Sequence, residues 1–106
     1  MVTQRIATAL EAKDVDEIDV LTFDFAPGLN VGEAVASVTV SCEAYDGIDA
    51  TPGAVLSGAP QVTGNKALQQ ITLGVAGVTY LVRAVAVLSG STRRLAIAAL
   101  LPVVRL

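Results

Sequence analysis

The sequence predicts an all-β protein, a small antiparallel β-sandwich of about six or seven strands. Apolar and polar residues alternate along several short stretches, which is the periodicity of strands with one buried face. Clusters rich in glycine, proline and asparagine separate most of these stretches, and no helical segment of crossover length lies between them, so a parallel sheet is not expected. Because the chain has 106 residues, it is long enough for one core and too short for two.

The N-terminal residues 1–13 are predicted to form an arm ahead of a single domain that spans residues 14–106. Ile6 and Ala9 would fit one face of a short helical turn, whereas Thr8 fits an extended segment. The sequence therefore leaves both conformations of the arm open.

The first strand of the domain is predicted at residues 19–25, where the alternation brings both phenylalanines of the chain into the core. Residues 26–32 end this strand, since proline lacks an amide donor and glycine favours turning. Leu29 and Val31 are expected to fold back and cover one end of the core.

The clearest alternation in the chain predicts a strand at residues 33–45. Its cysteine lies on the apolar face and is interpreted as a small core residue, because the chain contains no histidine that could activate a thiol. The face expected to be buried consists of Ala36, Val38, Val40, Cys42 and Ala44.

The middle of the chain is predicted to contain shorter elements. Residues 46–53 have the composition of a loop, residues 54–56 are expected to form a short strand, and residues 57–60 to turn again. Residues 61–63 lead to a further strand at residues 66–73. The alternation there is less sharply divided, with one face formed by Ala67, Gln69, Ile71 and Leu73.

The last third of the chain predicts a long hairpin, with strands at residues 80–88 and 94–103 joined by a turn at residues 89–91. The second strand is apolar on both faces from Ala96 to Leu101, so it requires a cover on both sides. A neighbouring subunit or the N-terminal arm could supply that cover. We therefore predict an interaction surface here that includes Ala96, Ala98 and Leu100. Arg93 and Arg94 are added to it because arginine is enriched at interfaces.

Composition excludes several classes of function. The net charge of −3 lacks the basic footprint that nucleic acid requires, and charged residues interrupt every apolar run before it could span a membrane. The glycines at residues 74–77 lack the lysine of a phosphate-binding loop. Asp24, Asp46 and Asp49 are interpreted as solvated acids, and the acidic residues 14–19 lack the spacing of a calcium loop. We expect no catalytic residue, cofactor or metal, and hence no enzyme.

Several stretches resemble small immunoglobulin-like phage structural proteins, the fibre-tail adaptors. They are the acidic lead and strand at residues 14–25, the Leu29 to Glu33 loop with the strand at residues 36–40 that follows it, the glycine turn and strand at residues 74–82, and the turn at residues 89–93. This resemblance implies an immunoglobulin-like sandwich and a non-enzymatic component of the virion, in the tail or neck. It also implies docking onto other phage virion proteins as a homo-oligomer or ring, after assembly in the cytoplasm of the host bacterium.

Two other functions stay open. A capsid decoration protein could have the same fold, at a different position in the particle. A carbohydrate-binding module at the host surface would need exposed aromatic residues, and only Tyr45 remains for that role, because Phe23, Phe25 and Tyr80 are assigned to the core.

Overall fold

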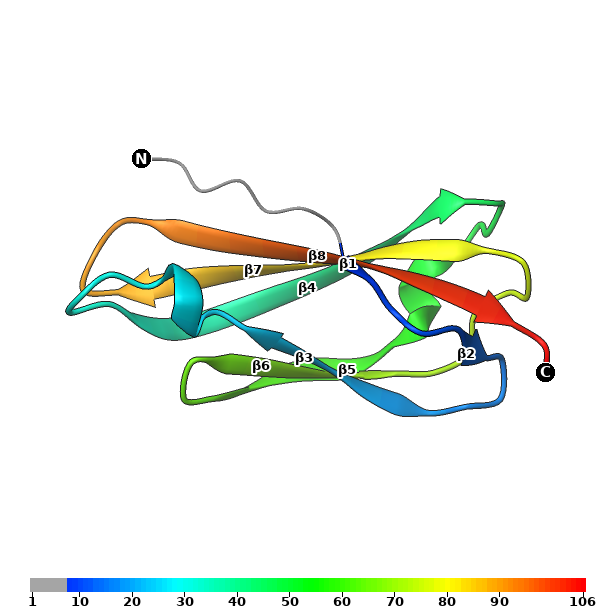
Figure 1. Cartoon of the computed structure of the whole chain (residues 1–106), viewed down its shortest axis with the longest axis horizontal. Coiled ribbons are helices and arrows are strands. Elements are labelled where there is room, and N and C mark those ends of the chain that lie inside the picture. Colours follow the sequence, from blue (N-terminus) through cyan, green and yellow to red (C-terminus); the bar gives the residue numbers. More distant parts are fainter. Residues whose placement is uncertain (1–7) are drawn as a thin grey trace.

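The computed structural model describes residues 8–106, which form an all-β sandwich of two packed sheets (Figure 1). The fold class predicted from the alternation is confirmed. We call the two layers the long sheet and the short sheet. The long sheet contains β4 (Ala34–Asp46), β7 (Thr79–Ser89) and β8 (Arg94–Val104), and the short strands β1 (Thr8–Ala9) and β2 (Lys13–Asp14) pair with β8. The short sheet contains β3 (Asp19–Asp24), β6 (Lys66–Ile71) and β5 (Leu56–Thr63).

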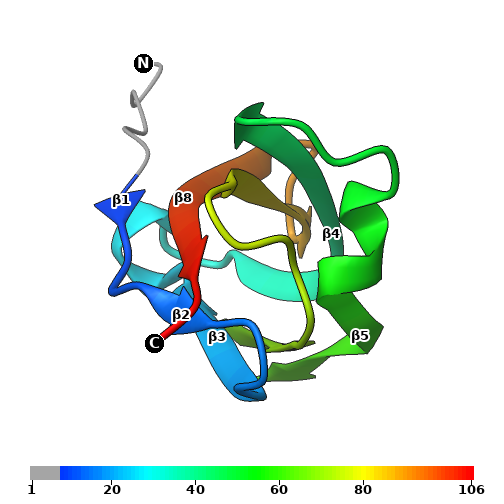
Figure 2. The same cartoon turned by 90° about the vertical axis from the view of Figure 1, so that its right-hand side faces the viewer.

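The strands pair in the order used by immunoglobulin domains. In immunoglobulin domains the second, fifth and fourth strands form one sheet, and the third, sixth and seventh form the other. If β1 and β2 are counted together as the first strand, these are β3, β6 and β5 in the short sheet and β4, β7 and β8 in the long sheet. These pairs are all antiparallel. The N-terminal segment differs from the constant-type order, because β1 and β2 run parallel to β8 instead of pairing with β3. The end-on view shows them on the same side of the sandwich as β3 (Figure 2).

The predicted arm is extended where the structure describes it. β1 pairs with Ala99 and Leu100, and β2 pairs with Val103 and Val104. The helical turn suggested by Ile6 lies outside the described residues. The arm therefore covers part of the free edge of β8 within the same chain.

The core lies between the two sheets and needs no crosslink. Val82 is fully buried two residues after Tyr80, at the position where antibody domains carry the second cysteine of their inter-sheet disulfide. The single cysteine, Cys42, is free and lies on β4. The largest fully buried side chains are Tyr80, Phe25, Ile71, Leu101, Gln69, Val55, Val82 and Val103.

The alternation predicted for β4 is correct for most of its length and wrong at its beginning. Ala36 is exposed, and Val35 is buried in its place. The pairing with β7 shifts between Val35 and Ser37, and such a bulge inserts one residue and moves the following side chains to the opposite face. From Val38 onward the alternate side chains pack against the core, as predicted.

The region before β6 differs from the sequence expectation. Pro52–Val55 form a 3₁₀ helix, η2, and residues 57–60, predicted to turn, belong to the continuous strand β5. The register with β6 shifts between Ser57 and Gln61, and Gly58 within this bulge has a φ of 72°. The buried Gln69 amide donates to the carbonyl of Gly58 at 3.1 Å, so it satisfies a backbone oxygen that the bulge leaves without a strand partner.

Two apolar residues predicted to pack against the core do not do so. Leu29, after the 3₁₀ helix η1 (Ala26–Gly28), packs against the core as predicted, but Val31 is fully exposed. β6 ends at Ile71, and Leu73 beyond it is exposed and has a φ of 51°. The chain reverses direction here, which removes Leu73 from the alternation of β6.

Candidate interaction surface

The solvent side of the long sheet, which we call the outer face, is largely apolar along its two central strands. Every second residue of β7 from Tyr80 to Leu88 is buried against the core, so the residues between them point outward. The same alternation holds in β8, except that Ile97 on the core side is only partly buried. The register places Leu81 beside Leu100 and Val85 beside Ala96. The apolar side chains of the outer face are Leu81, Val85, Val87, Ala96, Ala98 and Leu100.

Arginine and polar side chains flank this apolar centre. Arg83 lies beside Ala98 in the register, and Arg94 lies beside Val87, both exposed. The two arginines, together with Val85, Val87 and Thr39 of β4, line a shallow hollow of about 540 Å³. An apolar centre with arginine at its border is the composition of many protein interfaces.

Four of the five predicted interaction residues come together on the outer face, namely Arg94, Ala96, Ala98 and Leu100. The structure adds Leu81, Val85 and Val87 from β7, which the predicted set does not include. Their signal in the sequence is the apolar character of both alternating sets between residues 80 and 88.

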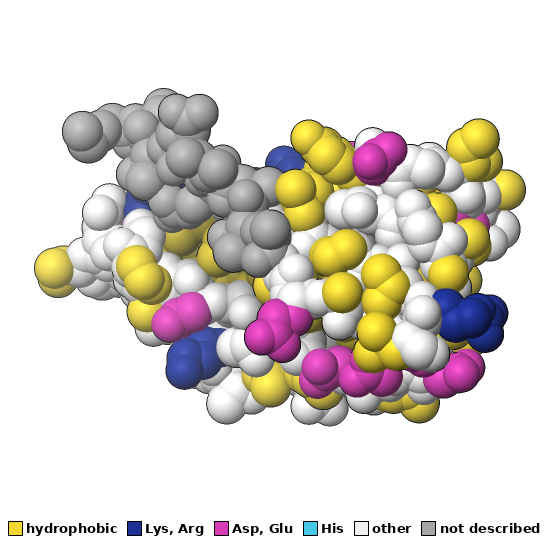
Figure 3. Space-filling model, turned by 45° about the vertical axis from the view of Figure 1, so that its right-hand side comes forward, with side chains coloured by type: hydrophobic (Ala, Val, Ile, Leu, Met, Phe, Trp, Pro, Cys, Tyr) yellow, Lys and Arg dark blue, Asp and Glu magenta, His cyan; other side chains and the backbone are white. Residues whose placement is uncertain are grey.

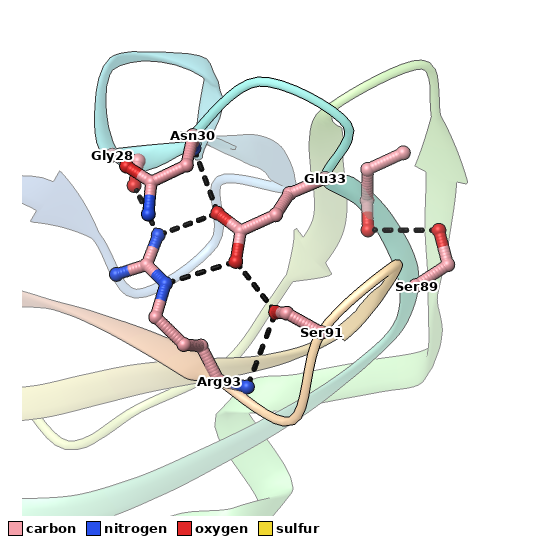
Figure 4. Close-up of polar contacts among 7 residues, drawn as sticks. Gly28, Asn30, Glu33, Ser89, Ser91 and Arg93 are labelled. Atoms are coloured by element: carbon pink, nitrogen blue, oxygen red, sulfur yellow. Dashed lines mark hydrogen bonds and ion pairs between the residues drawn. The ribbon is translucent and has the colours of Figure 1, made fainter.

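Arg93 lies apart from the outer face and binds within the chain (Figure 4). Its Nε donates to Glu33 Oε2 at 2.9 Å, and its Nη2 donates to Glu33 Oε1 at 2.6 Å and to the carbonyl of Gly28 at 2.9 Å. Ser91 Oγ and the amide of Asn30 also donate to the Glu33 carboxylate. We call these residues the Glu33 cluster. It joins the connection between β3 and β4 to the turn between β7 and β8.

The Glu33 side chain is only 4% exposed, while that of Arg93 is 37% exposed. The Arg93 hydrogen bonds, followed by those from Ser91 and Asn30, lower the pKa of Glu33 to about 2. Because its acceptors are filled by neighbours in the same chain, we assign Glu33 a structural role. The charge of Arg93 is likewise compensated within the chain.

The buried Tyr80 and the partly exposed Asp49 form a second polar contact, at the opposite end of the sandwich from the Glu33 cluster. The Tyr80 hydroxyl donates to Asp49 Oδ2 at 2.6 Å and accepts from the amide of Val75 at 2.8 Å. A tyrosine at the start of this strand that bonds back to the preceding loop is the tyrosine corner of immunoglobulin-like domains. The interpretation of Asp49 as a solvated loop acid is therefore wrong.

The environment of these groups changes their titration. Burial, followed by the Asp49 hydrogen bond, raises the pKa of Tyr80 to about 12, and the Tyr80 hydroxyl lowers the pKa of Asp49. Burial also raises the pKa of the Cys42 thiol to about 11, which opposes formation of a reactive thiolate.

Among the residues that the structure describes, no group of His, Cys, Asp or Glu is arranged to bind a metal ion. No helix formed by these residues is long and apolar enough to cross a membrane.

The arm is fixed to the domain by Lys13 and Asp14. Lys13 is buried, and its Nζ donates to the carbonyls of Asp14 and Leu73, each at 2.8 Å. Asp14 Oδ1 accepts from the amide of Leu106 at 2.7 Å. The arm thus covers the edge of β8, while the register leaves Ala96, Ala98 and Leu100 on the outer face.

These features define a small immunoglobulin-like β-sandwich with an apolar outer face on its long sheet. No family model matches the chain, and we found no match among curated proteins or solved structures.

Proposed function

We propose that the protein is a non-enzymatic structural component of a bacteriophage virion, an adaptor in the tail or neck. In this proposal it is assembled in the host bacterial cytoplasm and docks onto other virion proteins in a symmetric arrangement. The observation that carries the proposal is the outer face, where β7 and β8 expose apolar side chains although their opposite faces already form the core. The resemblance of residues 14–25, 74–82 and 89–93 to phage adaptors supplies the class of partner.

The outer face fits protein docking better than small-molecule binding. Ala96 and Ala98 are short, so a partner can approach the backbone of β8 closely, and Leu81, Val85 and Leu100 provide apolar area around them. Arg83 and Arg94 can pair with carboxylates of the partner at the border of the contact. The contact residues of the proposal are therefore the outer face and these two arginines, without Arg93.

A matched pair of substitutions tests the surface. Val87 of the outer face and Val62 of β5 are each 38% exposed, so a glutamate at either position costs the isolated chain a similar amount. We expect Val87→Glu to prevent incorporation of the chain into phage particles and Val62→Glu to permit it, as measured by mass spectrometry of purified particles. Equal incorporation of both variants would contradict docking through the outer face.

Location and stoichiometry test the rest of the proposal. Density for the chain at the tail or neck of an intact particle, in a ring of identical copies, is the expected result. Density on the head would instead assign it as a capsid decoration protein. Absence of the chain from purified particles would reject both virion assignments.

A carbohydrate-binding role is a second candidate because of one observation. Tyr45, at the end of β4, is 64% exposed, so its ring is accessible to a ligand. A glycan-array signal that Tyr45→Ala abolishes would favour this role over an adaptor. We expect no such signal.

A further inference from the structure

The short sheet ends in an edge strand, β3, whose outer side has no strand partner among residues 8–106. In the described part of the chain β3 pairs only with β6. The amide of Val20 binds Asp19 Oδ1 at 2.8 Å instead of β6. Because hydrogen-bonding direction alternates along an antiparallel strand, the backbone groups of Val20, Thr22 and Asp24 point away from β6. Such an edge can pair with another strand.

An apolar cleft of about 320 Å³ lies directly beside this edge, between β3 and β8. Its apolar lining comes from β3, β8 and the arm, and consists of Val20, Leu21, Phe23, Ile97, Ala98, Ala99 and Leu10. Among the residues that the structure describes, Thr22 is the only polar one in the lining. The cleft has room for an apolar side chain inserted between the two sheets.

The end of the cleft nearest β2 is acidic. A second hollow of about 210 Å³ shares Leu10 and Leu21 with the cleft and is lined by Glu11, Glu17 and Asp19. Lys13 also lines this hollow, but its Nζ already donates to two backbone carbonyls at 2.8 Å. Figure 3 shows acidic and apolar side chains side by side along the lower edge of the molecule, on the side of the short sheet.

We propose that an extended segment of a partner protein binds here by adding a strand to the outer edge of β3. The segment is apolar, places one side chain in the cleft, and carries a basic residue at the end that lies beside Glu17 and Asp19. Backbone hydrogen bonds to the Thr22 region give affinity, and the cleft and acidic end give sequence preference. This site shares Ala98 with the outer face, but its strand edge and its acidic end lie on other elements, so it would add a second contact to the proposed adaptor and does not depend on that proposal.

Two labelled peptides probe the site on the full chain. Both consist of alternating valine and threonine, and one begins with lysine where the other begins with glutamate. We expect the lysine peptide to bind about threefold to tenfold more tightly, as judged by fluorescence anisotropy, because it pairs with the acidic end. We also expect it to slow hydrogen exchange at the amide of Thr22, measured by NMR.

Substitutions at the edge give a matched control. Thr22→Pro removes an outward amide that β6 does not use and should keep the fold while lowering affinity at least tenfold, because proline cannot donate to an added strand. Thr22→Ala keeps that amide and should bind normally. If Thr22→Pro disturbs the fold, Asp19→Lys tests the site instead and should remove the preference for the lysine peptide. The control is Asp46→Lys, at an exposed acid on β4, which should keep that preference.

Four outcomes would overturn the proposal. One is that neither peptide binds, and another is that the lysine peptide binds equally to Thr22→Pro and Thr22→Ala. A third is that hydrogen exchange slows at amides away from β3. Self-association of the chain that Thr22→Pro abolishes would also overturn it, since the occupant of the edge would then be a second copy.

Discussion

The Glu33 carboxylate exchanges hydration by water for four hydrogen bonds from groups of its own chain. Its pKa of about 2 in the folded protein lies below the ordinary value of 4.5, so the unfolded chain binds the proton more readily. The stabilisation is therefore complete above about pH 4.5 and is lost as the pH falls toward 2.

Replacement of Glu33 by glutamine should remove this pH dependence. The variant should melt at a lower temperature than the natural protein at neutral pH, and the difference should shrink between about pH 4.5 and pH 2, the range set by the two pKa values. Thermal unfolding followed by circular dichroism at several pH values measures it. Glu43→Gln, on the exposed side of β4, is the control and should change the melting temperature little. A pH-independent difference would reject the assignment.

Tyr80→Phe should destabilise the fold by about 1–3 kcal/mol, because the amide of Val75 loses its acceptor and Asp49 loses its donor. The pKa of Tyr80 is raised to about 12 in the folded state, from 10, so the unfolded chain ionises first. Stability should accordingly fall as the pH rises from 10 to 12, and this fall should be weaker in Tyr80→Phe. Denaturant unfolding at alkaline pH measures it. Tyr45→Phe, at an exposed tyrosine, should retain the natural alkaline profile.

At the scale of elements, the turn between β7 and β8 packs tightly against the connection that precedes β4. Gly90 has a φ of 82°, and a Cβ there would collide with the carbonyl oxygen of Gly32. Gly64 has a φ of 60° but open space around its Cβ position. Alanine substitutions at Gly90 and Gly64 therefore separate the free-energy cost of backbone strain from the cost of a collision.

We expect Gly64→Ala to cost about 1–2 kcal/mol from the left-handed backbone alone. Gly90→Ala should cost more, about 3 kcal/mol or above, because two backbone segments must also move apart. Chemical denaturation of both variants measures the difference. Equal costs for the two variants would show that the segments around Gly90 and Gly32 move apart freely. That result would contradict the close packing of the Glu33 cluster.

The arm protects an edge, since β2 and the residues beside it pair with β8 near its C-terminal end. Removal of residues 1–15 should expose backbone groups of β8 and the apolar residues that Leu10 covers. We expect the truncated chain to melt at a lower temperature and to form oligomers whose size rises with concentration in light scattering. The truncated and full chains are compared at the same concentrations. If the truncated chain stays monomeric there, the edge of β8 needs no cover.

At the scale of the whole molecule, most of the secondary structure could be predicted because alternation reports directly on burial. It predicted the strands β3, β4, β6, β7 and β8 and the sandwich they form. It was wrong where the backbone departs from a regular pleat, as in β5, where a bulge keeps a proline- and glycine-containing segment within the strand. Alternation cannot detect a bulge, since the inserted residue changes the face of its neighbours without changing the composition.

The candidate surface could be predicted in part for the same reason. The two-sided apolar character of β8 identified Ala96, Ala98 and Leu100, which share the outer face with Arg94. The sequence predicts Arg93 for the same surface because arginine is enriched at interfaces. Its partner, Glu33, is distant along the chain, and only the packing of two loops brings them together.

The sequence by itself determined the fold class, the long hairpin and the apolar character of both faces of β8, because these depend on residue order within one strand. Only the tertiary structure decided which strands are neighbours. It placed the arm on the edge of β8, Glu33 beside Arg93 and Asp49 beside Tyr80, and it left the outer edge of β3 unpaired in the described residues. Those contacts join segments far apart in the chain, and their geometry depends on how two sheets pack, which no local pattern of residues encodes.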